Sequence, residues 1–168
     1  MPQSLVPAES IWTWKQADGS ILEVAWQCHA DTPDHGHNTS VPAVVLVHGF
    51  GASGNHWRHN LPVLGNYTRT FALDLIGFGG SSQPQALLQG EQTALDQADH
   101  SQALVYSFDL WGKQVADFCN AVVEGPVLLV GNSIGGVVAL RAAQLLGDQC
   151  KGVVLIDCAQ RLMDDKQL

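Results

Sequence analysis

The amino-acid sequence predicts an α/β protein built around a mostly parallel sheet. Three short apolar runs, residues 43–47 (AVVLV), 126–130 (PVLLV) and 152–157 (GVVLID), are continuous rather than alternating. Runs of this kind are typical of strands that are buried on both faces, as in parallel sheets. Segments with helical spacing lie between the runs, and alternating strands and helices favour a parallel α/β sheet with right-handed crossovers.

An antiparallel hairpin is predicted to come first in the chain. Residues 11–14 and 21–26 alternate, or nearly alternate, between apolar and polar side chains. The pair Asp18 and Gly19 lies between them and is a strong signal for a short turn. The sheet is therefore expected to begin with two antiparallel strands.

Three segments are predicted to be helices and one more to be a strand. Residues 55–64 and 109–123 carry apolar side chains at helical spacing, and residues 136–146 form a third helix-like stretch. Residues 70–75 (TFALDL) resemble a strand, which the glycine-rich segment 77–82 ends.

The glutamine-rich segment 83–104 stands apart from this pattern. It has few large apolar residues and no clear period. We expect it to be an exposed insertion within one domain that covers residues 1–168.

Composition and charge restrict the classes of partner that this chain is expected to bind. The net charge of −8 comes from 16 acidic and 8 basic residues, and the basic residues are scattered. Nucleic acid and anionic membrane surfaces are therefore not expected as partners. The amino-terminal residues show no signal peptide pattern, and no apolar run reaches the ~18 residues of a membrane span. We expect a cytoplasmic protein without a transmembrane segment.

No metal or cofactor site is predicted. The four cysteines are widely spaced, without a C-x-x-C pair, and we interpret them as structural thiols: Cys28, Cys119, Cys150 and Cys158. His29, His35 and His37 lie near Cys28, but prolines and a glycine predict a loop over residues 28–41 rather than a metal site.

A serine is predicted at the apex of a sharp turn. Residues 131–135 (GNSIG) follow the apolar run 126–130 and precede the predicted helix 136–146. Alone, a G-x-S-x-G pattern also fits an ordinary strand-to-helix turn in which Ser133 caps the helix. Between a strand and a helix, however, it is typical of a nucleophile elbow, where small flanking residues let the turn expose the serine oxygen.

Three motifs occur together in one order: residues 47–51 (VHGFG), 74–81 (DLIGFGGS) and 131–136 (GNSIGG). In order and spacing they resemble the α/β-hydrolase fold family. The details look most like a cyanobacterial and plastid branch of these hydrolases, which includes relatives of chlorophyll-metabolising esterases. Such kinship says little about the substrate.

The resemblance implies a serine hydrolase without a cofactor. Ser133 would attack the carbonyl carbon of a small ester-like or hydrophobic substrate, and the backbone N–H groups of Phe50 and Ile134 would form the oxyanion hole. The Phe50 side chain is then free to shape the acyl pocket. A serine nucleophile favours an esterase, lipase, thioesterase or C–C hydrolase over the family's aspartate-dependent members.

The sequence departs from the family pattern after Ser133. The family's triad follows the order serine, acid, histidine, but no histidine follows His100. The resemblance therefore implies an incomplete domain, cut after about six strands and without the triad histidine. Asp157, at the end of the last predicted strand, is an alternative acid.

The earlier histidines offer no clear base. The resemblance gives His48 a structural role in supporting the oxyanion loop, and nothing fixes His100, in the predicted insertion, near Ser133. His56 and His59 are expected to be surface residues. Asp74 is expected to tie the loop 77–82 by hydrogen bonds.

Three interpretations stay open. The chain is a truncated serine hydrolase that is weak or inactive alone, a split enzyme completed by another polypeptide, or a binding module that has lost the chemistry. A sheet cut after the sixth strand would leave residues 153–156 as an unpaired apolar edge strand. We therefore expect aggregation, or association with a partner through the sheet edge.

Overall fold

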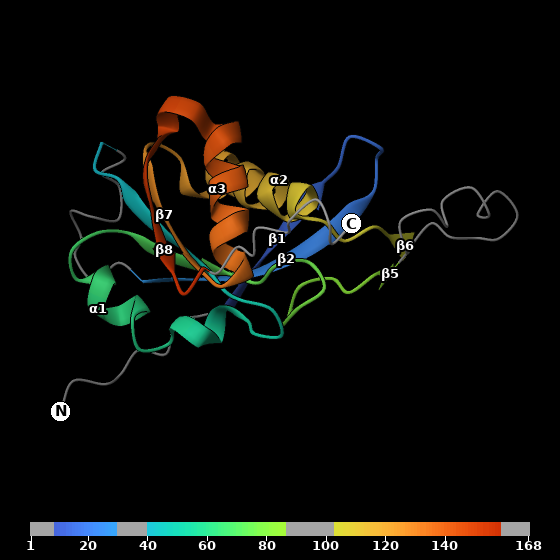
Figure 1. Cartoon of the computed structure of the whole chain (residues 1–168), viewed down its shortest axis with the longest axis horizontal. Coiled ribbons are helices and arrows are strands. Elements are labelled where there is room, and N and C mark those ends of the chain that lie inside the picture. Colours follow the sequence, from blue (N-terminus) through green and yellow to red (C-terminus); the bar gives the residue numbers. More distant parts are fainter. Residues whose placement is uncertain (1–8, 30–39, 87–102, 159–168) are drawn as a thin grey trace, which may run out of the picture.

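The central feature of the computed structural model is one mixed sheet of six strands (Figure 1). The structure describes residues 9–29, 40–86 and 103–158. In spatial order the strands are β1 (Glu9–Lys15), β2 (Ile21–His29), β4 (Thr70–Leu73), β3 (Ala43–Val47), β7 (Val127–Asn132) and β8 (Cys150–Ile156). β1 and β2 are antiparallel, β2 joins β4 antiparallel, and the remaining pairs are parallel. The predicted fold class is confirmed.

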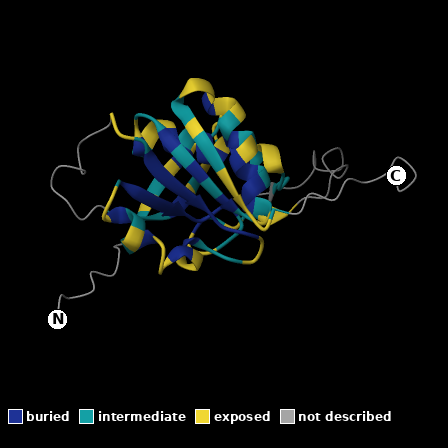
Figure 2. Ribbon diagram, turned by 60° about the vertical axis from the view of Figure 1, so that its left-hand side comes forward, coloured by how far each residue is buried: buried dark blue, intermediate teal, exposed yellow. Residues whose placement is uncertain are grey.

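Helices cover both faces of this sheet. The described helices are η1 (Gly54–Trp57), α1 (Leu61–Gly65), α2 (Phe108–Phe118), the π-helical turn η3 (Cys119–Val123), α3 (Ile134–Leu146) and η4 (Gly147–Gln149). In Figure 1, α2 and α3 lie together on one face, and α1 lies on the other. The three layers bury the middle strands from both sides, as the dark blue strands in Figure 2 show.

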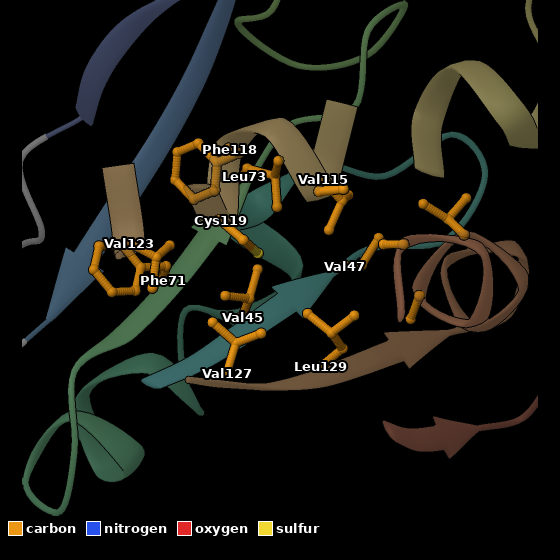
Figure 3. Packing of buried hydrophobic residues seen from close by; sticks show 14 of the residues in the cluster. Val45, Val47, Phe71, Leu73, Val115, Phe118, Cys119, Val123, Val127 and Leu129 are labelled. Carbon is orange, nitrogen blue, oxygen red and sulfur yellow. The ribbon is translucent and has the colours of Figure 1, made fainter. Parts of the chain in front are cut away.

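Side chains of β3 alternate between two hydrophobic clusters. Val45 and Val47 face the α2 and α3 layer, where Figure 3 shows Val115 of α2 among them. Val44 and Leu46 belong to the opposite cluster. All five residues of β3 are buried, which explains its continuous apolar sequence. Each buried valine or leucine side chain of β3 contributes about 1.5–3 kcal/mol of burial free energy.

The amino-terminal hairpin is attached to α2 by a hydrogen bond as well as by packing. Trp14 of β1 is buried, and its indole Nε1–H donates to Oδ2 of Asp117 at 2.8 Å. Its partner strand β2 continues through His29 by pairing with β4. Residues 28 and 29, predicted as the start of a loop, therefore belong to a strand.

The predicted helix over residues 55–64 is divided into η1 and α1. Pro62 lies at the start of α1, and proline lacks the N–H that a continuous helix would need there. The predicted strand 70–75 ends early, at Leu73, because the carboxylate and carbonyl of Asp74 make hydrogen bonds to loops. The helix predicted over 109–123 begins one residue earlier, where the Ser107 side chain accepts from the N–H of Leu110.

The ends of the predicted insertion pair with each other. β5 (Gln85–Ala86) and β6 (Ala103–Leu104) form a parallel two-stranded sheet. Residues 87–102, the middle of the segment, lie outside the described residues. Among the helices of the described ranges, none combines the length and apolarity that crossing a membrane requires.

Candidate active site

Ser133 occupies the sharp turn between β7 and α3. β7 ends at Asn132 and α3 begins at Ile134, so one residue separates strand from helix. The backbone of Ser133 has φ 54° and ψ −124°, a strained conformation for a residue with a Cβ atom. Ser133 is exposed. The predicted strand, turn and helix around the serine are confirmed.

The glycines around Ser133 are required by close contacts of the backbone. A Cβ atom on Gly131 would lie 2.2 Å from the carbonyl oxygen of Gly135. A Cβ atom on Gly135 would lie 2.5 Å from the carbonyl oxygen of Val47. Both contacts are far inside van der Waals distance and involve backbone, so neither position accepts a larger residue.

The end of β8 supports the same turn. The N–H of Ser133 donates to the carbonyl oxygen of Ile156 at 2.9 Å. Asp157 follows directly, is exposed, and has a positive φ of 47°. Asp157 therefore lies at the end of the last described strand, as expected, one residue beyond the carbonyl that holds the elbow.

The turn after β3 lies against the elbow. A Cβ atom on Gly49 would be 3.2 Å from Cβ of Ser133, and Phe50 follows Gly49 directly. On the other side, Ile134 is the first residue of α3, and the first N–H groups of a helix have no partner within the helix. The positive end of the 13-residue helix also favours negative charge near Ser133.

His48 is held in a structural role. Its Nε2 accepts from the N–H of Leu75 at 3.0 Å, and its Nδ1 lies 2.8 Å from the carbonyl oxygen of Gly49. Nε2 must be unprotonated to accept, so Nδ1 carries the proton and donates it to Gly49. Burial lowers the pKa of the His48 imidazole, which favours this neutral form. With both nitrogens occupied, His48 supports the turn before Phe50 and is not free to act as a base.

Asp74 organises the loops at the carboxyl end of β4. Its Oδ1 accepts from the N–H of Gly54 and its Oδ2 from the N–H of Gly80 at 2.7 Å. Its carbonyl oxygen accepts from the hydroxyl of Ser81 at 2.7 Å. The predicted role of Asp74 in tying the loop 77–82 is confirmed.

Gln114 contributes to this framework and was not found from the sequence. It is fully buried on α2, where its Oε1 accepts from the N–H of Ile76 at 3.0 Å and its Nε2–H donates to the carbonyl oxygen of Asp74 at 2.9 Å. One signal in the sequence could have indicated this role. Gln114 lies on the same helical face as Trp111 and Phe118, where a polar residue needs buried partners.

His56 and His59 lie in other surroundings than Ser133. The His56 ring contacts Trp57 edge-on with centroids 4.9 Å apart, and His59 is exposed. Across the described ranges, the Ser133 hydroxyl has no histidine hydrogen bond. His35, His37 and His100 lie outside these ranges.

Comparison with known proteins defines the class. Residues 42–167 match the family model described as the alpha/beta hydrolase fold. The chain therefore belongs to the α/β-hydrolase fold family.

Curated relatives include hydrolases of different chemistry. Over 133 residues the chain is 33% identical to chloroplastic pheophytinase of Arabidopsis thaliana, a match that covers 71% of this chain and 28% of the relative. Over 120 residues it is 30% identical to 2-hydroxy-6-oxo-6-(2'-aminophenyl)hexa-2,4-dienoic acid hydrolase of Metapseudomonas resinovorans, covering 69% of this chain and 35% of the relative. The chain thus spans about a third of the length of these relatives.

Solved structures agree with this fold. A membrane phospholipase A, described as a bacterial virulence factor, is 29% identical with a TM-score of 0.64, and the match covers 93% of this chain and 42% of that one. An esterase from Thermogutta terrifontis is 24% identical with a TM-score of 0.66, covering 95% and 48% respectively. The chain therefore covers somewhat less than half of each structure.

Proposed function

We propose that this chain carries the nucleophile and oxyanion hole of a serine hydrolase that cleaves esters or related acyl compounds. The observation that carries the proposal is the strained, exposed backbone of Ser133 between β7 and α3. Strain of this kind persists only where the surrounding structure enforces it, and it is typical of functional sites. The contact of Gly49 with the elbow supports a role for the next N–H, that of Phe50.

In the proposed reaction, Oγ of Ser133 attacks the carbonyl carbon while a base takes the hydroxyl proton. The N–H groups of Ile134 and Phe50 then donate to the oxyanion of the tetrahedral intermediate. The intermediate collapses to an acyl-enzyme as the base passes its proton to the leaving oxygen, which departs as the alcohol. Water, deprotonated by the same base, attacks the acyl carbon; the bond to Oγ of Ser133 breaks, Oγ regains its proton from the base, and the acid is released.

The base is proposed to come from outside the described residues. Both nitrogens of His48 are engaged, and the His56 ring is packed on Trp57. The undescribed histidines are His35, His37 and His100, and a histidine from another segment or polypeptide is the alternative. Asp157 is a candidate for the acid that orients this base, because it adjoins the Ile156 carbonyl bound by Ser133.

The substrate is proposed to be a small ester-like or hydrophobic molecule. Two relatives are named as a pheophytinase and as a hydrolase of a hexadienoic acid, and a structural neighbour is a phospholipase A. The names give different substrates, so they support a hydrolase of small organic molecules and indicate no particular ester.

The proposal is tested by turnover of p-nitrophenyl acetate and p-nitrophenyl butyrate. The wild-type chain is compared with Ser133→Ala and with Ser107→Ala, which removes a serine that caps α2. Turnover that is lost in Ser133→Ala and kept in Ser107→Ala supports the proposal. Equal turnover in the wild type and Ser133→Ala contradicts it. Single alanine variants of His35, His37 and His100 then identify a base within the chain.

A second candidate function is a binding module without chemistry. The observation that favours it is that the described histidines leave Ser133 without a base. Absence of turnover in the isolated chain, together with saturable binding of a phenylalkyl alcohol, which cannot bond covalently to Ser133, favours this candidate. Turnover that begins only when a second polypeptide is added supports a split enzyme instead.

A further inference from the structure

A row of aromatic rings runs from the elbow along the carboxyl ends of the parallel strands. We name it the aromatic row and define it as Phe50, Phe78, Trp111 and Phe108. Successive ring centroids lie 5.4 Å apart between Phe50 and Phe78, 5.9 Å between Phe78 and Trp111, and 6.1 Å between Trp111 and Phe108. These separations are typical of favourable aromatic contacts.

The row begins beside the nucleophile. Gly49 lies against Ser133, and Phe50 is the next residue along the chain. The side chain that starts the row thus belongs to the residue whose N–H is proposed for the oxyanion hole. In α/β sheets, ligands bind at the carboxyl ends of the strands, which is where β3, β4 and β7 bring these residues.

The inner part of the row is rigid. Trp111 is buried, and its indole Nε1–H donates to the carbonyl oxygen of Ile76 at 2.8 Å. The Phe78 ring also contacts the His48 ring edge-on at 5.6 Å. Phe78 is therefore held between His48, Phe50 and Trp111, so its ring is positioned before any ligand arrives.

The end of the row that lies beside Ser133 is exposed to solvent. Phe50 is 75% exposed although its ring touches Phe78. A large aromatic side chain that is exposed next to the proposed nucleophile, on a rigid aromatic support, can form one wall of an apolar ligand subsite.

We infer that Phe50 and Phe78 bind the apolar group of the substrate next to its reacting carbonyl, and that substrates with a medium-chain alkyl or aryl group are preferred. This inference rests on the proposed function, because Ser133 fixes where the carbonyl lies. The apolar group belongs either to the acyl part or to the leaving group, since both adjoin that carbonyl carbon. The chemistry recognised is the same in both cases.

The first test measures the rate at which phosphonates modify Ser133. One series has a fluoride leaving group and a methyl, hexyl or phenylbutyl group on phosphorus, which stands for the acyl part. The other series keeps methyl on phosphorus and varies the leaving group from fluoride to p-nitrophenolate and naphtholate. Phe50→Ala is compared with Tyr67→Ala, because Tyr67 is 74% exposed and lies at the amino-terminal end of β4.

The inference predicts that Phe50→Ala slows modification by the large apolar phosphonates of one series about tenfold more than it slows modification by methylphosphonofluoridate. Tyr67→Ala leaves both rates unchanged. The series that responds shows whether the acyl part or the leaving group occupies the subsite. Equal rates for Phe50→Ala and the wild type in both series overturn the inference while leaving Ser133 as the nucleophile.

A second test works without chemistry. The fluorophore N-phenyl-1-naphthylamine is titrated into chains that carry Ser133→Ala and Val154→Lys, the latter because Val154 is exposed on β8 and offers a competing apolar surface. We expect Phe50→Ala or Phe78→Leu to weaken binding at least about fivefold and Tyr67→Ala to have no effect. Unchanged binding in both variants overturns the inference, even where Ser133 proves unreactive and the proposed function fails.

Discussion

Steric demand at single residues shapes the elbow. Gly131 has a negative φ, yet its missing side chain is essential because a Cβ atom would overlap the carbonyl of Gly135. Gly147, in contrast, has a positive φ of 54° and open space around it. Gly131 is therefore required because a side chain does not fit, whereas Gly147 is favoured because its positive φ suits glycine.

Gly131→Ala is expected to lower the free energy of unfolding by more than about 3 kcal/mol, because backbone must move to admit the methyl group. Gly147→Ala is the matched control and is expected to cost about 1–2 kcal/mol, since its strain is conformational only. Urea unfolding followed by circular dichroism measures both. Equal costs for the two variants would show that the elbow is not closely packed.

The buried His48 imidazole makes stability depend on pH. Burial lowers the pKa of His48 in the folded state, so the unfolded chain takes up a proton at higher pH than the folded chain does. The contribution of His48 is fully present above its unfolded pKa of about 6.5. It is lost as the pH falls from there toward the folded pKa.

We expect the wild type to lose stability relative to His48→Gln between pH 7 and pH 5. In this variant the glutamine side-chain oxygen can accept from the N–H of Leu75 in place of Nε2 but does not titrate. Urea unfolding at several pH values gives the difference between the two proteins. A difference that does not change with pH would mean that His48 is not buried in its neutral form.

At the scale of elements, helix α2 fixes the loop that follows β4. Gln114 satisfies two backbone groups there, the N–H of Ile76 and the carbonyl oxygen of Asp74. Asp74 in turn holds the loops at Gly54 and Gly80. This network places Phe78, and with it the aromatic row, relative to the elbow.

Gln114→Leu is expected to destabilise the fold by about 2 kcal/mol or more, because it leaves two buried backbone groups without partners. Gln144→Leu serves as the control: Gln144 is exposed on α3 and its side-chain oxygen accepts from Arg141, an exposed contact whose loss should cost less than about 0.5 kcal/mol. Thermal unfolding of both variants provides the measurement. Similar melting temperatures for the two variants would contradict the role of Gln114.

The elements differ in how well their sequences predicted them. β3 was predicted to the residue because continuous burial leaves an uninterrupted apolar run. The division of residues 55–64 at Pro62 and the early end of β4 at Leu73 depend on local backbone chemistry and on long-range bonds to Asp74. The role of Gln114 was not predicted, because the two backbone groups that it bonds lie 38 and 40 residues away in the sequence.

The parts of the candidate site also differ in how well the sequence predicts them. Ser133 was predicted because a nucleophile elbow is a local pattern, in which contacts at Gly131 and Gly135 restrict the sequence. The aromatic row was not predicted, because it joins residues from three separate segments whose spacing carries no signal. The role of Asp157 stays a prediction.

At the scale of the whole molecule, β8 forms an apolar edge of the described sheet. Three consecutive residues, Val154, Leu155 and Ile156, are 51%, 46% and 42% exposed. Successive residues of a strand point to opposite faces, so apolar side chains on both faces of this strand are partly exposed. Within the described residues no further strand pairs with β8, and such an edge favours association.

The chain is expected to self-associate as its concentration rises, and Val154→Lys is expected to shift it toward the monomer, because a charged residue on an edge strand opposes pairing. Val63→Lys is the control, since Val63 is 57% exposed on α1, away from β8. Sedimentation velocity from low to high concentration measures the shift. An equal response to both substitutions would show that β8 is not the contact surface.

The central claim, that the fold presents Ser133 as a nucleophile, is tested most directly by locating the site of reaction with a fluorophosphonate. Peptide mass spectrometry is expected to place the phosphonyl group on Ser133, in preference to every other serine, and Ser133→Ala is expected to lose it. Phosphonylation spread over the exposed serines, and unchanged in Ser133→Ala, would contradict the account.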